Sequence, residues 1–329
     1  MKNQKVKFSI IVPVCKTEQY LEQCLQSIKN QDFEDFECIV INDGSSGVEK
    51  IMWDKWQDDF YVKNNSLLEV NLDQQCLNIF NSIVGQDKRF RYIYQENQGV
   101  SIAKNNALSH CNGEWIQVID SDDWIIPDFL QKYIDILNKF ENHLTLVPYF
   151  IIYQCYNTLF KLKSNYEPKK VTVANSFIYP TLMAWNYIQR NEIIQKYNLE
   201  FEPRLGPGPK REDKIIKHGY DDTMFAAKYL EAMAIEYGEK NINFAKFNND
   251  GYMYRDVDLV GKAVNYDNIS QSNFIDYLQT EMSRSPLKSV SKISTSIKPW
   301  YNLWYKKNLI SRIKKLYYTA LIRIKSSVN

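Results

Sequence analysis

The sequence of 329 residues predicts an α/β fold with a mostly parallel central sheet flanked by helices. Strand-like and helix-like segments alternate over the first 125 residues, which is typical of parallel strands joined by helical crossovers. The first apolar run, residues 8–14, is continuous, as expected of a strand buried on both faces. Polar clusters follow three of the four expected strands, and ligands of such sheets bind beyond the carboxyl ends of the strands.

The elements of the first 125 residues are predicted from their hydrophobic periodicity. Apolar residues at helical spacing indicate helices, and short apolar runs that end in polar residues indicate strands. The expected strands are residues 8–14, 36–41, 89–95 and 114–119, and the expected helices are residues 18–30, 51–56, 72–83 and 100–109.

Later elements are predicted from shorter signals. The expected elements are a helix at 129–140, strands at 144–156 and 169–178, and helices at 183–197 and 221–237. The Ser- and Lys-rich segment 284–299 is expected to be a linker, and residues 300–325 a basic amphipathic helix.

Charge is distributed unevenly along the chain. The sequence has 41 basic and 39 acidic residues, a net charge of +2. From Met282 to the end there are eleven basic residues and no acidic one, so a body of net charge −9 carries a tail of net charge +11. This asymmetry indicates a surface-binding tail on a globular body.

The composition excludes several classes of protein. With 44% hydrophobic and 24% charged residues, the chain is not disordered. No apolar run reaches the ~20 residues of a membrane span, and the N-terminal residues lack the cleavage site of a signal peptide. The six cysteines form no CxxC pair and the three histidines are not clustered, so we expect reduced thiols, a cytosolic protein and no zinc site.

The strongest candidate site is Asp120-Ser121-Asp122-Asp123, directly after an apolar strand. Three carboxylates within four residues repel one another unless a cation or hydrogen-bond donors neutralise them. Alternate residues of a strand share a face, so Asp120 and Asp122 are expected to point the same way. Two such carboxylates suit Mg²⁺ or Mn²⁺, which also bind phosphate oxygens. The alternative is that they only cap the helix that begins near Pro127.

Three weaker signals accompany this cluster. Asp43 ends the second strand, either in a simple turn or as an acceptor for a nucleobase edge. Lys104, after the Asn97-Gln98-Gly99 turn, is either a solvated lysine or one that neutralises phosphate. Asp221 and Asp222 begin a helix, where an acidic residue caps the helix or acts as a general base.

Taken in order, these segments resemble the family 2 inverting glycosyltransferases of the GT-A fold. The resemblance is carried by FSIIVPVCKTEQYLEQCLQSI, FECIVINDGSS, YQENQGVSIAKNNAL, GEWIQVIDSDDW and GYDDTMF, densely over residues 5–130 and sparsely over 180–260. It implies a GT-A (Rossmann-like) domain at residues 1–268. The charge and periodicity of residues 269–329 indicate a linker and a basic amphipathic helical region. Within the domain, residues 1–128 would be the nucleotide-binding half and residues 129–268 the acceptor half.

The resemblance also implies a role for each candidate residue. The donor would be a nucleotide sugar, expected to be a UDP-sugar, and the cofactor Mn²⁺ or Mg²⁺. The implied nucleotide contacts are Pro13, Asp43 for uracil, Asn97 and Lys104 for the nucleotide and diphosphate, and Asp120 for the ribose or a metal-bound water. The implied metal ligands are Asp122, Asp120 and, from the later chain, Asp258 or Asp256. The alternative role for this later segment is a phosphate contact from Arg255. The implied catalytic base is Asp222, supported by Asp221.

Several positions depart from the family pattern. Cys15 and Lys16 stand where the family commonly has an aromatic residue and an asparagine, P-x-[YF]-N, so stacking on the base is in doubt. Lys104 replaces a commoner arginine, and the acidic pair is Asp-Asp where Glu-Asp is more frequent. The connection between residues 48 and 87 is longer than usual.

The implied reaction moves a hexose or N-acetylhexosamine, with inversion, from the nucleotide sugar to a glycan or lipid-linked glycan of a cell-surface polysaccharide, such as capsule or lipopolysaccharide. One alternative is a non-catalytic sugar-nucleotide or glycan-binding module, which needs no base. Another is a nucleotidyltransferase, which usually has a glycine-rich basic loop near the N-terminus, whereas PVCKTEQYL has no glycine.

The basic tail predicts a location. In residues 300–325 apolar residues recur at helical spacing, most basic residues lie off that stripe, and Trp300 and Trp304 suit a lipid interface. We expect a helix on the anionic inner face of the cell membrane, which makes the protein peripheral. The alternative is that the stripe packs on the body or on another subunit, which leaves an oligomer open. Nucleic acid is not expected as a partner.

Overall fold

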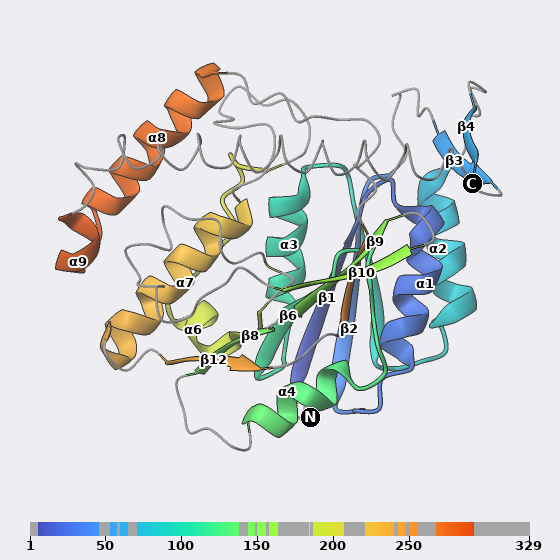
Figure 1. Cartoon of the computed structure of the whole chain (residues 1–329), viewed down its shortest axis with the longest axis horizontal. Coiled ribbons are helices and arrows are strands. Elements are labelled where there is room, and N and C mark those ends of the chain that lie inside the picture. The colour runs from blue at the N-terminus through green and yellow to red at the C-terminus, as the bar shows by residue number, and fades with distance from the viewer. Residues whose placement is uncertain are drawn as a thin grey trace.

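The computed structural model describes the following residues: 6–45, 53–57, 60–64, 71–137, 144–148, 150–155, 158–163, 184, 187–206, 221–239, 243–247, 251–255 and 268–292. Figure 1 shows a central sheet with helices on both of its faces. None of the helices in these ranges is long and apolar enough to span a membrane.

The central sheet has five strands in the order β11-β6-β1-β2-β5. Four of them are parallel, as expected, and the short edge strand β11 pairs antiparallel with β6. The strands are β1 (Phe8–Val14), β2 (Phe36–Asp43), β5 (Phe90–Gln95), β6 (Trp115–Val118) and β11 (Gln189–Arg190). The continuous apolar runs of β1 and β2 are explained by burial on both faces.

Two apolar cores lie on the two faces of this sheet. Phe8, Ile10 and Val12 of β1 belong to one core and Ile11 to the other, because successive side chains of a strand alternate between faces. Helices α1 (Glu18–Lys29), α2 (Leu72–Ile83) and α4 (Phe129–Leu137) pack in the first core. Helices α3 (Val100–Ser109), α6 (Asn191–Lys196) and α7 (Asp221–Tyr237) pack in the second.

Smaller sheets accompany the central one. The four-stranded sheet has the order β10-β9-β13-β7, and the others are the parallel pair β8 and β12 and the antiparallel pair β3 and β4. Their bounds are β3 (Trp53–Gln57), β4 (Phe60–Asn64), β7 (Trp124–Ile125), β8 (Leu144–Pro148), β9 (Phe150–Cys155), β10 (Thr158–Lys163), β12 (Asn243–Phe247) and β13 (Tyr252–Arg255). Because β7 directly follows the Asp120–Asp123 turn, its pairing with β13 brings Arg255 beside that turn.

Two sequence-based expectations are wrong. Residues 53–56, expected to be helical, lie in β3 of a hairpin. A run this short, with two tryptophans, fits the spacing of a helix and that of a strand equally well. The segment 183–197, expected to be one helix, includes β11 and is helical only from Asn191, because its residues 189–190 pair with β6 at the sheet edge. The expected strand at 169–178 and helix at 300–325 lie outside the described residues.

The last described helices are attached to α7. They are α8 (Asn268–Ser283) and α9 (Lys288–Ser291), and Figure 1 shows α8 running beside α7. Lys228 of α7 pairs with Glu281 of α8 at 3.2 Å, and the Ser285 hydroxyl donates to Glu231. Val290 of α9 is fully buried. The segment 284–299, expected to be a linker, therefore begins with a short helix that packs on the body.

Candidate active site

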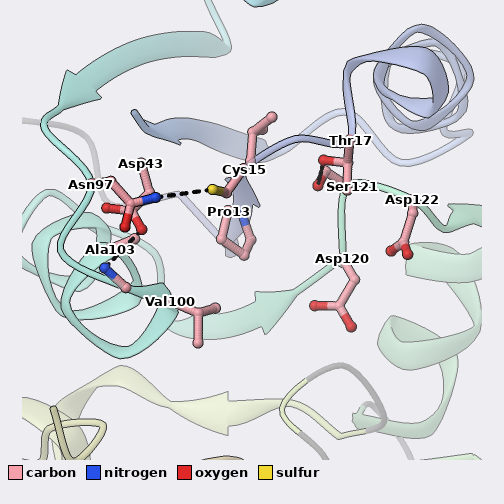
Figure 2. A pocket seen from close by; sticks show the side chains of 12 residues that line it. Pro13, Cys15, Thr17, Asp43, Asn97, Val100, Ala103, Asp120, Ser121 and Asp122 are labelled. Atoms are coloured by element: carbon pink, nitrogen blue, oxygen red, sulfur yellow. Dashed lines mark hydrogen bonds between the residues drawn. The ribbon is translucent and has the colours of Figure 1, made fainter. Parts of the chain in front are cut away.

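A cavity of about 340 Å³ lies where the carboxyl ends of β1, β2 and β6 meet. It is lined by Pro13, Val14, Cys15, Thr17, Asp43, Asn97, Gly99, Val100, Ala103, Asp120, Ser121 and Asp122. Figure 2 shows Asp43 and Asn97 at one end of this cavity and Asp120 and Asp122 at the other, with Pro13 between them. All five were predicted from the sequence for nucleotide or metal binding. The other predicted contacts are Lys104, Arg255, Asp256 and Asp258.

Asp43 ties the end of β2 to the turn after β5. Its carboxylate accepts hydrogen bonds from the Gln95 side chain at 2.7 Å and from the backbone N–H groups of Gln98 and Gly99, each at 2.9 Å. Burial raises the pKa of Asp43, and these three donors partly oppose that shift. The neighbouring Gly44 has a φ of +56°, and a Cβ there would lie 2.6 Å from the Asn97 nitrogen, so this close approach of two loops requires glycine.

The loop after β1 forms the middle of the cavity wall. The Asn97 side-chain amide donates to the Cys15 thiol at 3.2 Å, and the Lys16 N–H donates to the Ser45 hydroxyl at 3.1 Å. Burial, followed by the charge of Asp43, raises the pKa of Cys15 to about 11, so the thiol is protonated at neutral pH. Lys16 adopts a left-handed backbone with a φ of 59°, a conformation that asparagine tolerates better than lysine.

The acidic turn after β6 divides its carboxylates between two surroundings. Asp123 is buried and accepts from the Tyr252 hydroxyl and the Arg255 N–H, both at 2.7 Å, so it faces β13. Asp120 and Asp122 line the cavity. Burial raises the pKa of Asp120 to about 7, the charge of Lys104 opposes this shift, and the charge of Asp122 adds to it. The cavity end therefore presents two carboxyl groups, Asp120 and Asp122.

Arg255 of β13 also contacts the acidic turn. Its guanidinium lies over the rings of Tyr20 and Trp124, at 4.5 and 4.8 Å, and its Nε donates to the Asp122 carbonyl at 2.8 Å. Its predicted contact with phosphate stays a prediction. Asp256 and Asp258, the predicted further metal ligands, lie outside the described residues. Within the described ranges, no group of three or more His, Cys, Asp or Glu side chains is arranged to hold a metal ion.

Lys104 of α3 joins the two aspartates that begin α7. Its ammonium lies 2.6 Å from Asp222 Oδ1 and 3.2 Å from Asp221 Oδ2. Burial lowers the pKa of Lys104, but the charges of Asp222, Asp221 and Asp120 raise it by more, so the side chain stays protonated. Burial raises the pKa of Asp221 against the opposing effect of Lys104. The predicted contact of Lys104 with a diphosphate stays a prediction, because its described partners are these aspartates.

Sequence reasoning missed the loop that backs this ion pair. Phe201 lies under the Lys104 ammonium, 4.9 Å from ring centroid to nitrogen. Gly206 has a φ of +78°, and a Cβ there would lie 2.8 Å from Asp221 Oδ1. The glycines of RLGPGPK signal a tight turn, but nothing in the sequence connects that turn to Asp221, which lies beyond it in the chain.

Comparison with known proteins identifies the family. The model of glycosyl transferase family 2 matches residues 9–63 and 61–197. The chain belongs to glycosyl transferase family 2. Its GT-A fold is also confirmed by the crystal structure of S. aureus TarS 1–349 in complex with UDP-GlcNAc, which matches with a TM-score of 0.59 and 19% identity over 90% of this chain and 71% of that one.

Curated members of the family match this chain over only part of their length. The putative glycosyltransferase EpsH of Bacillus subtilis (strain 168) is 27% identical over 213 residues, which are 63% of this chain and 54% of EpsH. Glycosyltransferase GlyA of Streptococcus pneumoniae serotype 4 is 28% identical over 144 residues, 44% of this chain and 17% of GlyA. The chain therefore spans about half of EpsH and a smaller part of GlyA.

Proposed function

We propose that this chain is a metal-dependent inverting glycosyltransferase that moves a sugar from a nucleotide sugar to a glycan or lipid-linked glycan. The observation that carries the proposal is the cavity whose wall unites Asp43 and Asn97 at one end with Asp120 and Asp122 at the other. Membership of glycosyl transferase family 2 supports this reading of the cavity.

The donor is a UDP-sugar, bound with its base near Asp43. The carboxylate of Asp43 is held by three donors at the cavity wall, and Asn97 and Pro13 line the same part. The TarS structure was solved with UDP-GlcNAc, which supports a uridine nucleotide carrying a hexose or N-acetylhexosamine. The diphosphate then extends toward Asp120 and Asp122.

The residues at the acidic end fit a divalent cation. Mn²⁺ and Mg²⁺ prefer carboxylate oxygens, and Asp120 and Asp122 both line this end of the cavity. Asp122 and Asp120 would hold the ion, with Asp258 as a further ligand. When bound, it supplies charge stabilisation for the leaving diphosphate.

Asp222 is the catalytic base. Its side chain is 17% exposed, whereas that of Asp221 is 7% exposed, so Asp222 is the more accessible of the pair. A carboxylate at the first turn of α7 is held rigidly and can take the proton of an acceptor hydroxyl as that hydroxyl attacks the anomeric carbon. Attack on the face opposite the leaving diphosphate inverts the anomeric configuration. Asp221 supports the base as the second partner of Lys104.

The proposed setting is the synthesis of a cell-surface polysaccharide, such as capsule or lipopolysaccharide, at the inner face of the cell membrane. Similar proteins include a chondroitin synthase of Escherichia coli, 27% identical over 187 residues, and a teichoic acid poly(glycerol phosphate) polymerase of Staphylococcus epidermidis, 26% identical over 201 residues. Both names describe polymer-forming enzymes, which supports a role in polymer synthesis.

The test is a transfer assay with a panel of UDP-sugars, Mn²⁺ and glycan acceptors, read by release of UDP and by product mass. Asp222→Asn should lower kcat by about 10²–10⁴-fold, because the general base is lost, while UDP affinity stays within about twofold. Asp135→Asn, on the exposed face of α4, is the matched control and should leave kcat unchanged. Equal UDP release by the wild type and Asp222→Asn would refute the base. UDP binding without transfer to any acceptor would indicate a non-catalytic binding module.

A further inference from the structure

Lys104 is enclosed on several sides. Only 3% of the residue is exposed, and its ammonium contacts two carboxylates, Asp221 and Asp222. The face of Phe201 covers it at 4.9 Å, a favourable place for a cation. An ammonium so deeply buried is stable only when it is paired, so its position is dictated by these three neighbours.

The surroundings of Lys104 are themselves fixed by hydrogen bonds between α3 and the loop 201–206. Asn105 donates to the Phe201 carbonyl and accepts from the Phe201 N–H, each at 2.8 Å. The Ser101 hydroxyl donates to the Leu205 carbonyl at 3.1 Å. Phe201 in turn stacks on Phe225 of α7, with centroids 4.0 Å apart and planes 9° apart. Helix α3, the loop and α7 therefore form one packed unit around the ammonium.

We propose that Lys104 is the positioning residue of the catalytic base, an inference that rests on the proposed function. Lys104 binds Oδ1 of Asp222 and so directs the other carboxylate oxygen to the acceptor hydroxyl. Asp221 is the counter-ion that keeps Lys104 in place. Lys104 thus acts on the base through its side chain, and its role differs from the diphosphate contact that the sequence implies.

The experiment compares Lys104→Met with the wild type in kcat at saturating donor and in the Kd of UDP with Mn²⁺ by calorimetry. A base freed from its partner loses its orientation, and small misplacements of a reacting group reduce rates by about 10²-fold. We therefore expect kcat to fall by about 10²-fold and the Kd of UDP to change by less than about twofold. Lys132→Met is the matched control, because Lys132 of α4 pairs with Asp128, outside the site, and its loss should change neither quantity.

A second variant separates the loss of catalysis from a loss of stability. Lys104→Met alone leaves Asp221 buried without its cation, whereas Lys104→Met with Asp221→Leu replaces the buried pair by apolar groups, a change that is often tolerated. The double variant should unfold at the wild-type temperature and show the same loss of kcat. A kcat within twofold of the wild type would overturn the proposal. A Kd of UDP weakened tenfold or more would also overturn it, because Lys104 would then act at the diphosphate. Failure of the proposed function would appear in the wild type itself, as no transfer from any donor.

Discussion

Asp122 and Asp123 are adjacent in the sequence but belong to different parts of the molecule. Asp122 lines the cavity, whereas Asp123 is buried against Tyr252 and Arg255 of β13. The sequence predicts that two of the three carboxylates converge, because alternate residues of a strand share a face. It does not predict the task of the third, because the donors that satisfy Asp123 come from a strand about 130 residues later.

Lys16 gives a prediction at the residue scale. Its φ of 59° places a lysine in the left-handed region, which costs about 1 kcal/mol relative to residues that favour it. Lys16→Asn should therefore raise the free energy of unfolding by about 0.5–1 kcal/mol, measured by urea denaturation.

Asn198, with a φ of 47°, provides the reciprocal change. Asn198→Lys should lower the free energy of unfolding by a similar amount for the same reason. If Lys16→Asn destabilised the protein while Asn198→Lys had no effect, backbone conformation would not be the cause at either position.

At the scale of elements, local periodicity predicts the helices and strands that bury one or both of their faces in the core. β1, β2, α1 and α3 carry patterns that match their two-sided or one-sided burial, and they form at the expected residues within one or two positions. β11 has only two residues, and it is a strand because it pairs with β6, a contact between distant parts of the chain. Such short edge strands depend on tertiary context, which periodicity does not report.

The attachment of α8 gives a prediction at the same scale. Arg204 donates to both oxygens of Glu202, at 2.7 and 2.9 Å, and the Tyr277 hydroxyl of α8 donates to Glu202 at 3.1 Å. Burial raises the pKa of Glu202, but the hydrogen bonds and charge of Arg204 lower it by more, from 4.5 to about 2. Since the pKa is lower in the folded state, this cluster stabilises the fold above about pH 4.5 and loses its effect as the pH falls toward 2.

Glu202→Gln should therefore lower the free energy of unfolding by about 1 kcal/mol at pH 6, a modest value because Arg204 is 40% exposed. The difference from the wild type should shrink as the pH falls from 5 to 2, measured by urea denaturation at each pH. In a background of Arg204→Met, Glu202→Gln should produce a much smaller pH-dependent difference. A difference that stayed constant down to pH 2 would contradict the assigned cause.

At the scale of the whole molecule, the topology explains why the cavity was predictable and the ion pair was not. Parallel strands bring Pro13, Asp43 and Asp120 to one edge, whatever the loops between them contain. The pair between Lys104 and Asp221 joins residues 117 positions apart and depends on how α7 docks against α3. Between these helices, Phe201 bonds to Asn105 of α3 and stacks on Phe225 of α7, contacts that have no signature in the sequence.

The structure also moves the boundary between the body and the basic tail. Arg284, Lys288 and Lys292 belong to a segment attached to the body, because its Val290 is fully buried and its Ser285 and Ser289 hydroxyls donate to Glu231 of α7 and to Glu239. The remaining eight basic residues lie in 293–329, without an acidic one, and residues 1–292 hold 33 basic and 39 acidic residues. A deletion from residue 285 would thus remove part of the body together with the tail.

Deleting residues 293–329 is the sharper test of membrane binding. Basic residues near an anionic surface contribute about 1 kcal/mol each, so removing eight of them should reduce sedimentation with phosphatidylserine-containing vesicles to the level seen with neutral vesicles. The unfolding temperature should stay that of the full chain, because α8 and α9 are both retained. Deleting 285–329 should remove vesicle binding as well and also lower the unfolding temperature, because it removes the buried Val290 and the hydrogen bond from Ser285 to Glu231 of α7. Vesicle binding that persists after deletion of 293–329 would show that the tail is not the membrane-binding element, and loss of stability in that variant would show that residues 293–329 pack on the body.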